Sequence, residues 1–155
     1  MIQRIRVATI IMNGQKILLV KHVHPENGFA WWVPPGGGLE DKDNSIFDCA
    51  KREAFEETNL AVDVSKIIYL REFLDSESDK INLEVFMLAK GFNGEIGIQN
   101  IQDTGEDDYF IKDVAWFSKE DLQKMVVFPE ILKDKFWDDL KTDFSSTKYL
   151  GRQIG

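Results

Sequence analysis

Apolar and polar residues alternate with the two-residue period of β-strands through much of the chain. Residues 5–11 alternate, and a second apolar run at 16–20 follows Asn13-Gly14, which predicts two strands joined by a tight hairpin. Residues 29–33 form a short aromatic strand that Pro34-Pro35 ends. Apolar runs at 67–70 and 81–88, separated by a polar turn, and a last run at 114–117 predict three more strands.

Helical spacing appears in three places. Residues 45–58 form the longest periodic stretch, and Ser118 with Asp121 resembles a capping box that begins a short helix ending near Met125. Pro129 then begins another helix, for which five residues predict one continuous buried stripe: Phe128, Ile131, Leu132, Phe136 and Leu140. No pattern continues beyond Thr142, so residues 142–155 are expected to form a loosely ordered tail. Helices before and after mixed strands predict an α/β fold, with a central mixed sheet covered on both faces.

Composition limits the organisation and the partners. The chain has 155 residues and 43% hydrophobic residues, enough for one core, so residues 1–155 are expected to form a single domain. A formal net charge of −8 argues against nucleic acid and anionic membranes as partners, and a phosphate substrate would need a metal. Cys49 is the only cysteine, and no apolar run approaches a membrane span, so a cytoplasmic protein is expected.

The helix at 45–58 carries three glutamates in unusual places. At about 100° per residue, Glu57 falls inside the apolar stripe, and Glu53 and Glu56 border it. A solvated acidic face is the simpler interpretation of a Glu-rich helix, but these acids do not point directly to solvent. Buried carboxylates need a compensating cation, and oxygen ligands without a His or Cys cluster favour Mg²⁺ or Mn²⁺. The preceding Gly36-Gly37-Gly38, taken alone, predicts a turn.

Taken together, residues 32–40 (WVPPGGGLE) and 52–60 (REAFEETNL) resemble the Nudix box of the Nudix hydrolases. The helical half matches the family pattern at every charged position. The loop departs from it, because five residues after Gly37 stands Asp43, and eight residues instead of seven then precede Arg52. Counting back from Arg52 puts Asn44 at the first glutamate position. Asn59 replaces the family glycine and is expected to end the helix in the left-handed conformation, so that Asn59→Gly would be neutral or stabilising.

The resemblance implies a Nudix-type α/β/α sandwich and a set of site residues. The expected metal ligands are Gly37, through its carbonyl, and Glu53, Glu56 and Glu57. The expected catalytic residues are Arg52, Glu53 and Glu56, and the expected substrate-binding residues are Trp32, Gly37 and Gly38. Two general bases remain open: Glu53, and a loop acid that is more simply explained as a solvated charge. The loop candidates are Glu106, Asp107 and Asp108.

The resemblance also implies the activity, a metal-dependent pyrophosphohydrolase with Mg²⁺ or Mn²⁺ as cofactor. Water would attack phosphorus in a nucleoside diphosphate linked to another group, and the protein would act as a monomer or homodimer on a small nucleotide. Nucleoside triphosphates, nucleotide sugars and dinucleoside polyphosphates all remain open as substrates. The alternative is a Nudix-fold module that binds or senses a nucleotide without hydrolysing it, which the three intact glutamates disfavour.

Overall fold

Two β-sheets form the middle of the molecule. The computed structural model describes residues 1–101 and 110–155. The first sheet contains, in spatial order, β5 (Gly36–Gly38), β1 (Ile2–Ile10), β7 (Lys80–Asn93), β6 (Ala61–Asp75) and β9 (Lys148–Ile154). It is mixed, because β1 pairs with β7 and β6 with β9 in parallel, whereas the other pairs are antiparallel. This arrangement confirms the predicted mixed sheet.

The second sheet is smaller, and a turn at Gly14 joins its first two strands. It contains β2 (Met12–Asn13), β3 (Lys16–Val23) and β4 (Ala30–Val33), with β8 (Phe110–Ser118) on the other side of β3. The predicted hairpin is therefore only partly right. Met12–Asn13 pairs with β3, but β1 lies in the first sheet, where it pairs with β5 and β7. Sequence alternation identified these strands without showing that they belong to different sheets.

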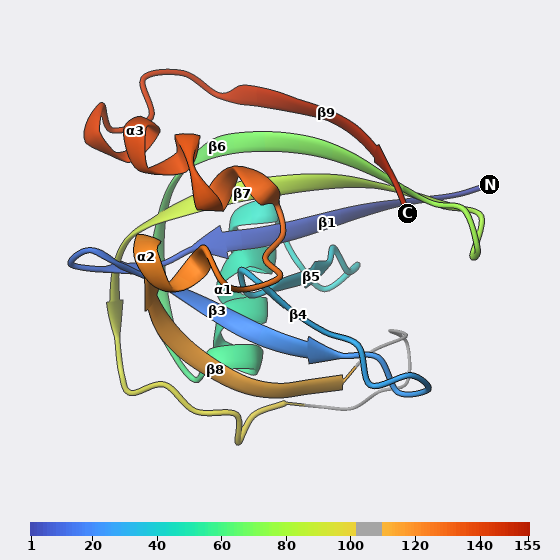
Figure 1. The fold of residues 1–155 in the computed structure, drawn as a ribbon, viewed down its shortest axis with the longest axis horizontal. Helices are drawn as coiled ribbons and strands as arrows, with labels where there is room; N and C mark the ends of the chain where they lie inside the picture. The colour runs from blue at the N-terminus through green and yellow to red at the C-terminus, as the bar shows by residue number, and fades with distance from the viewer. Residues whose placement is uncertain (102–109) are drawn as a thin grey trace.

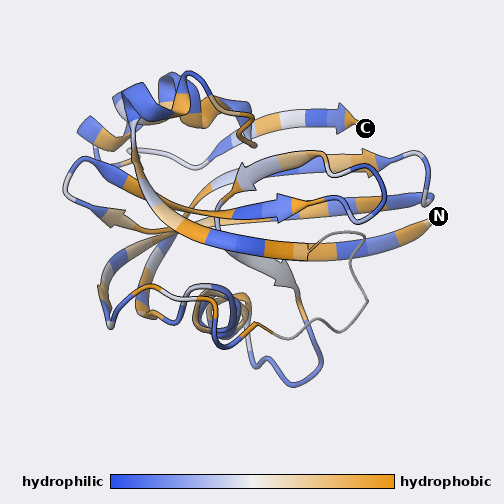
Figure 2. Ribbon diagram, turned by 60° about the horizontal axis from the view of Figure 1, so that its bottom comes forward, coloured by the Kyte–Doolittle hydropathy of each residue, from blue (hydrophilic) through white to orange (hydrophobic). Residues whose placement is uncertain are grey.

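Helices cover the strands from two sides (Figure 1; Figure 2). On one side α1 (Ile46–Thr58) packs on a core with residues from both sheets. On the other side lie α2 (Lys119–Leu122), the 3-10 helix η1 (Glu130–Lys133) and α3 (Lys135–Lys141), over a second core that contains Phe136 and Leu132. The α/β/α layering is thus confirmed. None of the helices in the described residues is long and apolar enough to cross a membrane.

The C-terminal part differs from the expectation in two ways. The single predicted helix is broken at Asp134, whose φ of −139° and ψ of −89° are not helical, so η1 and α3 share the apolar stripe. Residues 148–154 form β9 where the sequence suggested a loose tail. This strand lies beside β6, and Lys148 bonds Asp139, which also accepts a hydrogen bond of 2.6 Å from the Tyr69 hydroxyl. Long-range pairing, invisible in local periodicity, orders the segment.

The caps of α1 agree with the sequence. Ser45 begins the helix by accepting a hydrogen bond from the Asp48 amide (3.2 Å), and Asn59 ends it with a φ of 66°. The predicted left-handed cap is confirmed. The Asn59 side chain also donates to the Glu95 carbonyl (3.0 Å) and accepts from Asn100 (2.7 Å). Asn59 therefore fixes the C-terminal end of α1 to the segment that follows β7.

Candidate active site

The three glycines form the edge strand β5, where the sequence had suggested a turn. They pair with Arg6, Val7 and Ala8 of β1. A Cβ atom at Gly36 would lie 2.5 Å from the Val7 carbonyl oxygen, and one at Gly37 would lie 2.5 Å from the Glu53 carboxylate. None of the three has a positive φ. The glycines are needed for close approach, which brings the β5 backbone directly against the carboxylates of α1.

Two glutamates of α1 are buried against this backbone. The Glu57 side chain accepts a hydrogen bond of 2.9 Å from the Gly36 amide, and Glu57 is only 7% exposed. Glu53 is 9% exposed and lies over Gly37. The helical angles had placed Glu57 in the apolar stripe and Glu53 at its border, and the structure agrees with both. The carboxylates of Glu53 and Glu57 on α1 therefore lie next to the backbone of β5.

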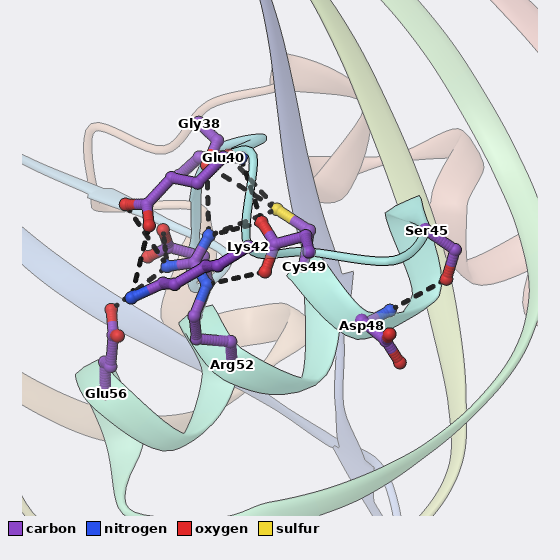
Figure 3. Close-up of polar contacts among 11 residues, drawn as sticks. Gly38, Glu40, Lys42, Ser45, Asp48, Cys49, Arg52 and Glu56 are labelled. Carbon is purple, nitrogen blue, oxygen red and sulfur yellow. Dashed lines mark hydrogen bonds and ion pairs between the residues drawn. The ribbon is translucent and has the colours of Figure 1, made fainter.

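The region where α1, β5 and the loop between them meet is called the acidic corner below, and Arg52 is the centre of its ion pairs (Figure 3). Its guanidinium donates to the Glu53 carboxylate (2.8 Å), the Glu56 carboxylate (3.3 Å) and the Gly38 carbonyl (3.1 Å). The hydrogen bonds with Asp43 and then with Glu53 raise the pKa of Arg52, so it stays charged. The side chain is 16% exposed. Arg52 therefore orients two of the predicted metal ligands relative to β5.

Asp43 resolves the ambiguity in the loop before α1. Both of its carboxylate oxygens bond Arg52, each at 2.8 Å, and its side chain is 3% exposed. The bonds from Arg52 lower the pKa of Asp43 from 3.8 to about 2. Asp43, and not Asn44, thus supplies the acid that pairs with the arginine of the box. The additional loop residue lets the shorter Asp reach it, and the loop closes with an Asp43 amide bond to the Glu40 carbonyl (3.0 Å).

Glu53 and Glu56 differ in their surroundings. Burial raises the pKa of Glu53, and the hydrogen bond from Arg52 only partly offsets this effect. The neighbouring charge of Glu56 raises it further. The Glu56 side chain is 32% exposed and reaches the surface of the corner. Glu53 is therefore placed to accept a proton more readily than an ordinary glutamate.

The donor set fits a hard divalent cation. Carboxylate oxygens and glycine carbonyls surround the corner, and these are the ligands that Mg²⁺ and Mn²⁺ prefer. In residues 1–101 and 110–155, however, no group of three His, Cys, Asp or Glu side chains already stands in a metal-holding arrangement. Arg52 and the Gly36 amide hold the glutamates instead. Cys49 is fully buried near the Gly38 carbonyl, and burial raises the pKa of its thiol to about 12.

The two tryptophans of β4 lie in different environments, because successive side chains of a strand point to opposite faces. Trp32 packs edge-on against Phe117, with ring centres 4.7 Å apart, in the core on the α3 side. The Trp31 ring lies against the rings of His22 and the exposed Phe29, with ring centres 5.5 Å and 5.8 Å apart, respectively. Of the three predicted substrate-binding residues, Gly37 and Gly38 therefore lie at the acidic corner, and Trp32 lies apart from it.

Arg6 is a site residue that the sequence did not single out. Burial lowers the pKa of His22 to about 3 and the charge of Arg6 adds to this effect, while the same charge offsets a small part of the rise in the pKa of Glu53. The loop acids Glu106, Asp107 and Asp108, proposed as alternative bases, lie outside the described residues.

Comparisons with known structures agree with this geometry at the level of the fold. The E. coli ORF135 protein superposes with a TM-score of 0.70 at 21% identity, covering 94% of this chain and 96% of that one. A Nudix hydrolase from Nitrosomonas europaea gives 0.70 at 22% identity, covering 92% and 90%. An ADP-ribose pyrophosphatase from Streptococcus suis gives 0.56 at 20% identity, covering 98% of each chain. A search of curated proteins found no match.

The sequence itself matches a family model over nearly the whole described fold. The model is that of the NUDIX domain, and it matches residues 2–136. This range contains the glycine strand β5, the acidic helix α1 and the Arg52 ion pairs. The chain therefore belongs to the Nudix family.

Proposed function

We propose that this protein is a metal-dependent Nudix pyrophosphohydrolase that cleaves a nucleoside diphosphate linked to another group. Nudix hydrolases act on pyrophosphate bonds. One observation carries the proposal: Glu53 and Glu57 of α1 are buried against the backbone of β5, and Glu56 of the same helix is held beside them by Arg52. A purely structural acidic helix would leave such groups in solvent, because burial of uncompensated carboxylates is unfavourable.

Mg²⁺ or Mn²⁺ would be held by Glu53, Glu56 and Glu57 with the Gly37 carbonyl, and when bound it would neutralise the diphosphate and activate water. The residues of the chain have separate roles. Arg52 positions Glu53 and Glu56 through the bonds described above, and Asp43 keeps Arg52 in place. Glu53, which is buried against β5, accepts the proton of the attacking water.

The proposal leaves open which group is linked to the nucleoside diphosphate of the substrate. One structural neighbour is described as an ADP-ribose pyrophosphatase and another as a MutT protein, so nucleotide sugars and nucleoside triphosphates both belong in the substrate panel. We propose a small nucleotide as the substrate in either case. A release assay for phosphate, pyrophosphate and nucleoside monophosphate distinguishes the bond that is cleaved.

The test compares wild type, Glu56→Gln and a matched control, Glu120→Gln. Glu120 is an exposed helical glutamate in α2, outside the acidic corner. Glu56→Gln should fold normally and lose at least about 100-fold in hydrolysis with Mg²⁺, and its melting temperature should rise less on addition of Mn²⁺. Glu120→Gln should match wild type. Nucleotide binding without hydrolysis of any compound in the panel would instead indicate a binding module.

A further inference from the structure

The loop between β3 and β4 holds an exposed aromatic side chain in a fixed position. Phe29 is 52% exposed and is the last residue of this loop, residues 24–29, which lies beyond the end of β3 (Figure 1). The Phe29 amide donates to the Asn27 side chain (2.8 Å), and the Phe29 carbonyl accepts from the His24 amide (2.8 Å). The Gly28 amide donates to the His24 carbonyl (3.0 Å). The backbone of Phe29 is therefore held in place although its ring belongs to neither core of the described residues.

Trp31 supports one face of the Phe29 ring. The two rings are stacked, with centres 5.8 Å apart and planes inclined by 23°. Buried His22 of β3 packs edge-on against Trp31, with ring centres 5.5 Å apart. Because Trp31 lies on one face of Phe29, the exposed area of Phe29 belongs to its edge and its other face. We call the stacked pair of Phe29 and Trp31 the aromatic platform.

A flat apolar surface of this kind fits a flat ligand. Single exposed hydrophobic residues are common on proteins, and by themselves they do not indicate a site. Phe29 differs because its backbone and one face of its ring are fixed before any ligand arrives, so little conformational entropy would be lost on binding. Aromatic side chains of proteins stack on nucleobases in this way, and every nucleobase has a face to offer.

The aromatic platform lies on the side of the second sheet that faces α1. Val20 of β3 and Val33 of β4 belong to the core on which α1 packs. His22 and Trp31 are two residues away from these valines on the same strands, and they pair with each other in register. Side chains two residues apart on a strand project to the same side. The platform therefore continues the face of β3 and β4 that α1 covers.

Two observations place the platform within reach of the acidic corner. Trp31 precedes Gly36 of β5 by five residues, so their Cα atoms are at most about 18 Å apart. The charge of Arg6 lowers the pKa of both His22 and Glu53, so one side chain lies close enough to affect both. A nucleotide with its diphosphate at the glutamates can therefore extend its base toward the platform.

We propose that the aromatic platform, Phe29 backed by Trp31, binds the nucleobase of the substrate, and that the substrate is a purine nucleotide. The two fused rings of a purine cover more of the Phe29 ring than a pyrimidine does, and base preferences on aromatic side chains follow stacking strength. This assignment rests on the proposed function, because it takes the base from the nucleotide whose diphosphate would be cleaved at the acidic corner.

The test compares binding of adenosine monophosphate and ribose 5-phosphate by calorimetry in the presence of EDTA, so that no metal contributes. The two compounds differ only in the base. Wild type should bind adenosine monophosphate about tenfold more tightly than ribose 5-phosphate, and more tightly than cytidine monophosphate. Phe29→Leu should weaken adenosine monophosphate about tenfold and leave ribose 5-phosphate unchanged, because leucine is apolar but has no flat ring.

Two variants serve as controls. Phe29→Tyr keeps the ring and should bind adenosine monophosphate as wild type does. Phe47→Leu makes the same change at another exposed phenylalanine (39%), on α1, and should also match wild type. Equal losses in Phe47→Leu and Phe29→Leu, weak binding by Phe29→Tyr, or equal affinities of wild type for adenosine monophosphate and ribose 5-phosphate would overturn the platform. Equal affinities for the adenosine and cytidine compounds would overturn the purine assignment.

The binding result and the hydrolysis result can fail separately. Nucleotide hydrolysis by wild type, together with unchanged binding of adenosine monophosphate in Phe29→Leu, would reject the platform and leave the proposed function standing. Base-dependent binding that Phe29→Leu abolishes, without hydrolysis of any compound in the substrate panel, would reject the proposed activity and retain the platform as the base site of a binding module.

Discussion

Asp43→Asn tests the ion pair that positions Arg52. The bonds from Arg52 hold the pKa of Asp43 at about 2 in the folded protein against its ordinary value of 3.8, and each unit of difference corresponds to about 1.4 kcal/mol. The charged carboxylate should therefore contribute about 2 kcal/mol to the free energy of unfolding at pH 7. Asn keeps the size and one acceptor but removes the charge, so the variant should be less stable by about this amount.

The pH dependence gives the sign of the effect. Because the folded pKa is depressed, the contribution is fully present above about pH 4 and disappears as the pH falls through about 2. The difference between wild type and Asp43→Asn in urea unfolding should therefore fall from about 2 kcal/mol at pH 7 to about 1 kcal/mol at pH 3. Urea avoids the screening that guanidinium chloride would add.

The exposed neighbour Asp41 provides the control, and Asp41→Asn should change neither stability nor its pH dependence. Hydrolysis by Asp43→Asn should fall about 10-fold to 100-fold, since residues that orient metal ligands have effects of this size. A stability difference that stayed constant from pH 7 to pH 3 would refute the ion pair as its source. A difference of zero at pH 7 would refute the positioning role as well.

Four further substitutions test neighbouring parts of the site. Gly37→Ala places a methyl group 2.5 Å from the Glu53 carboxylate and should lower hydrolysis strongly in a protein that circular dichroism shows to be folded. Glu57→Gln keeps an acceptor for the Gly36 amide, so melting without metal should hardly change, while the Mn²⁺-induced rise in melting temperature should shrink. Trp32→Ala is expected from the sequence to weaken nucleotide binding. If Trp32→Ala only lowers stability and Trp31→Ala weakens nucleotide binding instead, the substrate-binding role belongs to Trp31. Asn59→Gly at the C-cap of α1 removes two side-chain hydrogen bonds and should lower the free energy of unfolding in urea by about 1 kcal/mol. The sequence alone had predicted a neutral or stabilising effect.

The acidic helix could be predicted from the sequence because its information is local. Helical periodicity gives the bounds of α1 nearly as observed, and the angular positions of Glu53 and Glu57 predict their burial. The left-handed cap at Asn59 follows from the same local rules. For this part of the site, the order of residues along one helix was sufficient.

The remaining features depend on residues far apart in the chain. Whether Asp43 or Asn44 pairs with Arg52 depends on how an irregular loop folds, which periodicity does not describe. The glycines form a strand only because β1 lies beside them, and β9 is ordered only because β6 offers a parallel partner. The positions of Arg4 and Arg6 in the first sheet likewise depend on the register of β1 with β7. Each of these requires the tertiary structure.

The burial of Cys49 provides a chemical probe of motion at the acidic corner. It is the only cysteine of the chain, it lies beneath β5 with its sulfur 3.7 Å from the Gly38 carbonyl, and its pKa is raised to about 12. Alkylating reagents attack thiolates, so modification at pH 8 must proceed through transient separation of β5 from α1. The labelling rate of the native protein, divided by that of the unfolded chain, therefore gives the equilibrium constant for local opening of this corner, without any engineered reporter.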